Sequence, residues 1–95
     1  MVNKRNVKKR IKIVYKKLGR EKIYGHADDY PLTIDSRIKG LKKIEIIIHE
    51  CLHYLQPELS EEDVVIVSVR LARTLWYESV RFTDNTDTEP LQDEI

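Results

Sequence analysis

The sequence predicts an α+β fold in which a small antiparallel β-sheet precedes a two-helix hairpin. Before Gly40, short β-branched runs alternate apolar and polar residues, a period typical of half-buried strands. After Gly40, apolar residues recur at helical spacing in two segments that Pro57 separates. A chain of 95 residues is expected to form at most one domain.

Three short segments are the expected strands. Residues 11–15 are β-branched and aromatic, and Gly19 ends that run. Residues 22–26 form the second candidate. Residues 32–35 follow the turn-forming run 28–31 and alternate apolar with polar side chains. We expect the three strands to pair in an antiparallel sheet.

The first helix is expected to begin at Gly40 and to end near Leu55, because Pro57 disfavours helical backbone in the residue before it. One apolar stripe follows its helical period: Leu41, Ile44, Ile48, Leu52 and Leu55. The helix that follows would be joined to it by only about five residues, so the two helices should pack antiparallel.

The second helix is expected to begin at Ser60 as N-cap and to continue to about Arg81. Acidic residues in its first turn suit the positive end of the helix dipole. Its expected core face is formed by Val64, Ser68, Leu71 and Leu75, with Val65, Ala72 and Trp76 on the flanks.

The charge distribution divides the chain into three expected parts. Residues 1–10 form a basic N-terminal arm, residues 11–82 a single domain, and residues 83–95 an acidic tail that has too little to bury and should be disordered. The tail holds five acids and no base, whereas the first 22 residues hold ten Lys or Arg and one acid. The net charge of +1 gives no indication of bulk binding to a polyanion, so nucleic acid is not an expected partner.

The sequence favours a cytoplasmic protein without a membrane partner. Cys51 is the single cysteine, so no intramolecular disulfide is possible, as is usual in a reducing compartment. The longest aliphatic runs, residues 46–48 and 64–67, are far too short to cross a bilayer. The basic N-terminus is not followed by an apolar stretch of signal-peptide length.

The run His49-Glu50-Cys51-Leu52-His53 is the clearest indication of chemistry. Two histidines four residues apart lie on one helix face, one turn from each other, within reach of a single zinc ion. On the helical wheel they fall at the border between the apolar stripe and solvent, where a cleft would lie. In this motif Glu50 is the general base for the water that the metal activates.

A catalytic zinc site needs a third protein ligand, and the expected one is Glu61. The candidates are the acids that follow His53: Glu58, Glu61, Glu62, Asp63 and Glu78. Glu78 should lie roughly 25 Å farther along the second helix. Glu61 is expected to point toward the core, where a carboxylate needs a partner. Glu62 is the second choice.

Two further residues carry weaker indications. Cys51 falls on the core side of its helix and is expected to be a small buried side chain rather than a ligand. His26, beside a turn, could approach the zinc from the sheet, although a surface histidine is the preferred interpretation.

These residues together resemble a family. Residues 32–35, Leu41, the continuous run 46–64 and the pair Leu75-Trp76 are similar to the minimal zincin-like HExxH proteins common in bacteriophage genomes. The resemblance covers about residues 24–82. It implies a zinc-dependent metallopeptidase-like scaffold with His49 and His53 as ligands and Glu50 as catalytic acid and base. A phage origin would imply the host cell cytoplasm.

Three functions are compatible with the sequence. The first is a zinc metallopeptidase whose peptide or protein substrate pairs with an edge strand at residues 32–35. The second is a non-catalytic zinc-binding phage accessory module that binds a host protein. The third is a nucleic-acid-associated protein that uses the basic residues 4–20. The sequence predicts no oligomeric state.

Overall fold

The computed structural model describes residues 9–18, 24–26 and 30–83. Most of the predicted basic arm and of the acidic tail lie outside these residues, as does part of the turn before residue 30. The chain runs through β1 (Ile13–Lys16), β2 (Gly25–His26), β3 (Leu32–Asp35), α1 (Gly40–Leu55) and α2 (Glu61–Tyr77).

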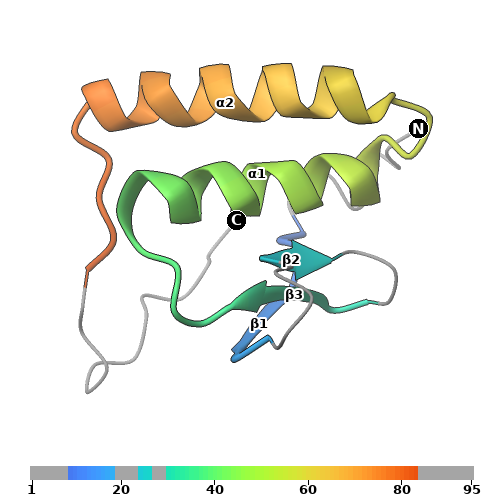
Figure 1. Ribbon diagram of the computed structural model, residues 1–95, viewed down its shortest axis with the longest axis horizontal. Coiled ribbons are helices and arrows are strands. Elements are labelled where there is room, and N and C mark those ends of the chain that lie inside the picture. Colours follow the sequence, from blue (N-terminus) through green and yellow to red (C-terminus); the bar gives the residue numbers. More distant parts are fainter. Residues whose placement is uncertain (1–8, 19–23, 27–29, 84–95) are drawn as a thin grey trace.

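The elements form three layers (Figure 1), with α1 between α2 on one side and the sheet on the other. This is a small α+β arrangement in which the strands come first and the helices last. Neither helix in the described part of the chain is long and apolar enough to span a membrane.

The prediction of an antiparallel sheet is wrong. The strand order is β1-β3-β2, so β3 lies in the centre. It pairs in parallel with β1, where Ile13 lies opposite Leu32, and antiparallel with β2, where Gly25 lies opposite Ile34. The strands do alternate in direction along the chain. Since β3 rather than β2 takes the centre, β1 and β3, which run the same way, become neighbours.

The central place of β3 follows from its burial. All four of its residues are buried, and Leu32 and Ile34 are fully excluded from solvent. A central strand is covered along both edges, which suits a segment with so little exposed surface. The prediction that residues 32–35 form an edge strand is therefore wrong, because hydrogen bonds to β1 and β2 occupy both edges of β3.

The carboxylate of Asp35, at the end of β3, is buried and fully hydrogen-bonded. It accepts hydrogen bonds from the backbone N–H of Arg37 at 2.9 Å and from the Arg37 guanidinium at 3.0 and 2.7 Å. The backbone N–H of Leu18 donates to it at 3.3 Å. The hydrogen bonds from the Arg37 side chain, above all, hold the pKa of Asp35 well below its usual range. This network ties the end of β1 to the turn after β3.

The start of α1 requires a glycine. Gly40 has φ of +62°, a conformation that residues with a Cβ rarely adopt. A Cβ on Gly40 would also lie 3.5 Å from the indole of Trp76, near the end of α2. The start of α1 and the end of α2 thus meet, as expected for an antiparallel hairpin. The end of α1 at Leu55 matches the prediction made from Pro57.

The prediction of a single apolar stripe on α1 is incomplete. Ile44 and Ile46 are both buried although they are two residues apart, and so point in nearly opposite directions. Burial on two sides follows from the position of α1 between α2 and the sheet. Glu50, one turn beyond Ile46, lies on the same face and is also buried.

The second helix begins as predicted, since the hydroxyl of Ser60 accepts a hydrogen bond from the N–H of Asp63 at 3.1 Å. Its buried residues are Val64, Ser68 and Ala72, one turn apart. The prediction that Leu71 and Leu75 belong to the core is wrong, because they are 47% and 38% exposed. The contact with α1 instead uses small side chains, which allow two helices to approach closely.

The predicted end of α2 at about Arg81 is also wrong. The helix ends at Tyr77, because Ser79 adopts φ of +69°. The N–H of Ser79 donates to the carbonyl of Trp76, and the N–H of Val80 donates to that of Leu75, both at 3.0 Å. These two bonds form a Schellman motif that satisfies the last carbonyls of the helix.

Candidate metal centre

The residues singled out by the sequence meet at one end of the helical hairpin. His49 and His53 lie in the last two turns of α1, and Glu61 is the first residue of α2. Residues 56–60 reverse the chain between them. Because the connection is short and the helices are antiparallel, the end of α1 lies beside the start of α2 (Figure 1).

The three side chains converge at ligand distances. Nε2 of His49 and Nε2 of His53 are 3.2 Å apart. One carboxylate oxygen of Glu61 lies 3.2 Å from Nε2 of His49, and the other lies 2.8 Å from Nε2 of His53. Four ligands around zinc, at bond lengths of about 2.0–2.1 Å and the tetrahedral angle, would be about 3.3 Å apart. The observed spacings are close to or below that value, and one ligand atom from each of the three residues lies within 4.8 Å of the others, so this group could hold a metal ion.

Exposure increases across the site toward α2. The side chain of His49 is 18% exposed, that of His53 32% and that of Glu61 66%. The expectation that Glu61 points into the core is therefore wrong, although it does face both histidines. A site with one well-exposed ligand leaves room for water or a substrate as the fourth ligand, which a catalytic zinc site requires.

Glu50 is buried on the sheet side of α1, where β2 passes close to it. A Cβ on Gly25 would lie 3.1 Å from Cγ of Glu50 and 2.9 Å from the backbone oxygen of Thr33. Only glycine allows β2 to approach α1 this closely. The role of Gly25 was not predicted from the sequence, although a glycine within a strand is a known sign of a close backbone contact.

The other candidate ligands do not join this group. Within the part of the chain that the structure describes, the side chains that could jointly hold a metal are those of His49, His53 and Glu61. Glu78 is the C-cap of α2, at the far end of that helix. His26 lies in β2 opposite Thr33, and its side chain is outside what the structure describes.

Cys51 does not join the group either. Burial, and then the nearby carboxylate of Glu50, raise the pKa of the Cys51 thiol. Its sulfur is not among the ligand atoms that lie together at the site. The half-buried position of Cys51 is close to the small core residue that the sequence predicts.

An aromatic pair that the sequence analysis missed lies beside the site. The rings of Tyr30 and Tyr54 are stacked, with centroids 5.1 Å apart and planes inclined by 29°. Tyr54 lies one turn beyond Glu50 on the same face of α1. Both tyrosines are more than 40% exposed, so they offer a partly apolar surface next to the carboxylate.

A scan against protein-family models and searches of curated proteins and of solved structures found no match for this chain. A functional assignment therefore depends on the side chains of the site itself. These are the two imidazoles, the carboxylate of Glu61 that faces them, and the buried Glu50 beside them.

Proposed function

We propose that the protein is a zinc-dependent metallopeptidase-like protein in which His49, His53 and Glu61 hold the ion. The observation that supports this most directly is that the two imidazole nitrogens lie 3.2 Å apart and each has one carboxylate oxygen of Glu61 within 2.8 to 3.2 Å. Zinc bound there would lower the pKa of a water ligand toward about 7 and polarise a carbonyl group. A chelating pair of imidazoles with one carboxylate is a common ligand set of hydrolytic zinc.

Glu50 is the proposed general base. It follows His49 and precedes His53 by three residues, so its side chain starts from the same region of the helix surface. Its carboxylate would take a proton from the attacking water and give it to the leaving amine of the peptide. Gly25 allows β2 to pack against Glu50 and thereby limits where this carboxylate can move.

The proposed substrate strand pairs with the edge of β2 rather than with β3. In the order β1-β3-β2, β2 is an edge strand, and it is the one that passes beside Glu50. A peptide added there would form backbone hydrogen bonds along an edge that the described strands leave unpaired. The Tyr30–Tyr54 pair lies on the same side of α1 and would contact apolar side chains of the peptide.

Metal analysis and peptide turnover test the proposal together. We expect about one zinc per chain, loss of that zinc in His49→Ala and His53→Ala, and cleavage of a peptide library that a chelator abolishes. The matched control is Glu50→Gln, which should keep the zinc and lose turnover, because an amide cannot serve as the base. Full zinc content in both histidine variants would contradict the proposed site, and full turnover by Glu50→Gln would contradict the proposed base.

A non-catalytic zinc-binding module that binds another protein is the second candidate. The observation that favours it is the number of large apolar side chains that α2 exposes: Val65, Ile66, Leu71, Leu75 and Tyr77. This candidate predicts the same zinc content and the same loss of zinc in the histidine variants. It differs in that no peptide of the library is cleaved and Glu50→Gln behaves like the unchanged protein.

A further inference from the structure

The outer face of α2 is open at the surface of the molecule. Among the described elements, α2 packs only against α1, and no described element lies on its far side (Figure 1). Its buried residues are Val64, Ser68 and Ala72, two of which are small. Larger apolar side chains of the helix stay exposed, among them Ile66 at 49% and Tyr77 at 83%. A helix that uses so little of its apolar surface within its own fold has surface left for a partner.

Five exposed residues form one stripe along this outer face: Asp63, Ile66, Arg70, Arg73 and Tyr77. Their spacing alternates between three and four residues, which is the spacing of side chains along the seam between two packed helices. At about 100° per residue they fall within a sector of roughly 80°, opposite the buried Ser68. The stripe therefore faces solvent along almost the whole length of α2.

The stripe carries opposite charges in its two halves. Asp63 lies in the first turn of α2, whereas Arg70 and Arg73 lie in the second half of the helix. An acid in the first turn suits the helix dipole, but the last turn of α2 holds no base, so the dipole does not account for the two arginines. The ion pairs within the described residues include none of these three side chains.

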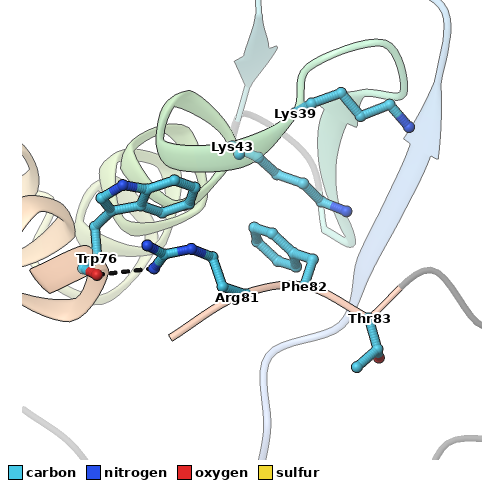
Figure 2. A pocket seen from close by; sticks show the side chains of 7 residues that line it. Lys39, Lys43, Trp76, Arg81, Phe82 and Thr83 are labelled. Carbon is cyan, nitrogen blue, oxygen red and sulfur yellow. Dashed lines mark hydrogen bonds between the residues drawn. The ribbon is translucent and has the colours of Figure 1, made fainter. Parts of the chain in front are cut away.

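Arg81, the next arginine along the chain, is engaged by its own surroundings instead. Its guanidinium carbon lies 3.5 Å from the centroid of the Trp76 ring, a cation–π stack. Its Nη1 donates a hydrogen bond to the carbonyl of Trp76 at 2.8 Å (Figure 2). Arg70 and Arg73 are therefore the cations that the outer face of α2 offers to a partner.

We propose that the outer face of α2 binds the same face of a second copy of this chain, in an antiparallel arrangement with two-fold symmetry. Asp63 and Arg73 each lie five residues from Ser68, roughly 7.5 Å along the helix axis on either side of it. A two-fold axis at the height of Ser68 brings Asp63 opposite the partner's Arg73, and the symmetry forms this pair twice. The same rotation brings Ile66 against the aliphatic stem of the partner's Arg70.

The charges determine both the partner and the direction. In a parallel arrangement Asp63 would meet the partner's Asp63, and Arg73 the partner's Arg73, and both pairs repel. A stripe that supplies both members of each ion pair is complementary to itself, which a two-fold interface requires. The proposal is independent of the zinc site, because Glu61 faces the histidines of α1 on the other side of the helix.

Sedimentation velocity over a range of protein concentrations measures the dimer. We expect a dissociation constant in the micromolar range, because one pair of helices buries less surface than a standard interface of about 1,600 Å². Asp63→Arg and Arg73→Glu each turn two attractive pairs into two repulsive ones and should weaken dimerisation about tenfold or more. Lys42→Glu makes the same change of net charge as Arg73→Glu on α1, away from the stripe, and should have little effect.

A mixture of the two charge-reversal variants makes the test specific. In a mixed dimer of Asp63→Arg with Arg73→Glu, each position 63 again faces a position 73 of opposite charge. The mixture should therefore dimerise at concentrations where neither variant does so alone. A variant that had lost its fold would not be rescued in this way, and circular dichroism of each variant confirms that the helices are present.

Three results would overturn the proposal. The first is a chain that stays monomeric up to about 1 mM, a concentration at which even a weak specific interface is populated. The second is unchanged dimerisation of both charge-reversal variants, which would place the contact on another face. The third is a mixture of the two folded variants that stays monomeric, which would exclude the pairing of Asp63 with the partner's Arg73.

Discussion

One carboxylate oxygen of Glu61 lies 2.8 Å from Nε2 of His53, across the turn that joins α1 to α2. The other oxygen of the same carboxylate lies 3.2 Å from Nε2 of His49. A single acid therefore reaches both imidazoles, which determines how the first turn of α2 is rotated relative to α1. This rotation turns the neighbouring Glu62 away from the histidines, since successive helical residues are about 100° apart.

We predict that zinc affinity depends on Glu61 and not on Glu62. Glu61→Ala should weaken zinc binding by more than the roughly 10- to 100-fold that is typical when a ligand loses its outer hydrogen-bond partner. Glu62→Ala removes the same charge one residue away and should change the affinity little. Competition with a chromophoric chelator measures both. Equal affinities of the two variants would exclude Glu61 as a ligand.

We predict that Gly25→Ala lowers peptide turnover and stability while the zinc content stays the same. The added Cβ would lie 2.9 Å from the backbone oxygen of Thr33 and 3.1 Å from Cγ of Glu50, so β2 or Glu50 must move. Overpacking of this kind typically costs about 1–3 kcal/mol.

Gly40→Ala is the control for that variant, because it strains the backbone at the other end of α1, away from Glu50. It should reduce the free energy of unfolding without changing turnover per folded molecule. If Gly25→Ala turned over peptides at the normal rate, Gly25 would not be positioning Glu50.

We predict that Asp35→Asn lowers the thermal midpoint at neutral pH. The difference in thermal midpoint between the variant and the unchanged protein should become smaller in acid. The hydrogen bonds from Arg37 hold the pKa of Asp35 below its value in the unfolded chain. The contribution of the ionised carboxylate to the free energy of unfolding is therefore fully present above about pH 5 and declines as the pH falls below about 4. Thermal melts of both proteins between pH 7 and pH 3 measure this. A difference that stays constant over the whole range would contradict it.

We predict that Ser79→Gly stabilises the protein by about 1 kcal/mol. The positive φ of Ser79 strains a residue that has a Cβ, whereas glycine adopts this conformation freely. The expected increase in thermal midpoint is roughly 4–8 °C for a domain of this size. Glu78→Gly serves as the opposite control, because φ at Glu78 is −84°. It should destabilise the helix end. An increase in both midpoints would show that the left-handed conformation of Ser79 is not the cause.

Features set by neighbours in the sequence could be predicted. Pro57 fixes the end of α1, and the hydroxyl of Ser60 caps the helix that follows, so both helix boundaries at the turn follow from local chemistry. The same boundaries set the rotation of α2 that brings Glu61 to His49 and His53. This part of the candidate site needed no knowledge of the sheet.

Features that depend on distant parts of the chain were not predictable in the same way. The alternation in β3 is equally compatible with a central or an edge position, and competition with β1 and β2 for its two edges decides the order. The helical period is satisfied by Leu71 and Leu75 as well as by Ser68 and Ala72. The close approach of α1 leaves room only for the smaller side chains, so Ser68 and Ala72 are the pair that is buried. The closeness of Gly25 to Glu50 arises only once β2 pairs with β3.

The position of the ligand candidates along the chain determines how an ion would bind and dissociate. The three ligand candidates lie close together in the sequence, with His49 and His53 at the end of α1 and Glu61 at the start of α2. An ion bound to them would therefore close only a short loop. Closing a short loop removes little freedom from the unfolded chain. The β3–α1–α2 layers are held together by their own apolar contacts. The chain would therefore keep its fold without the ion, and the ion could bind and dissociate while the protein stays folded.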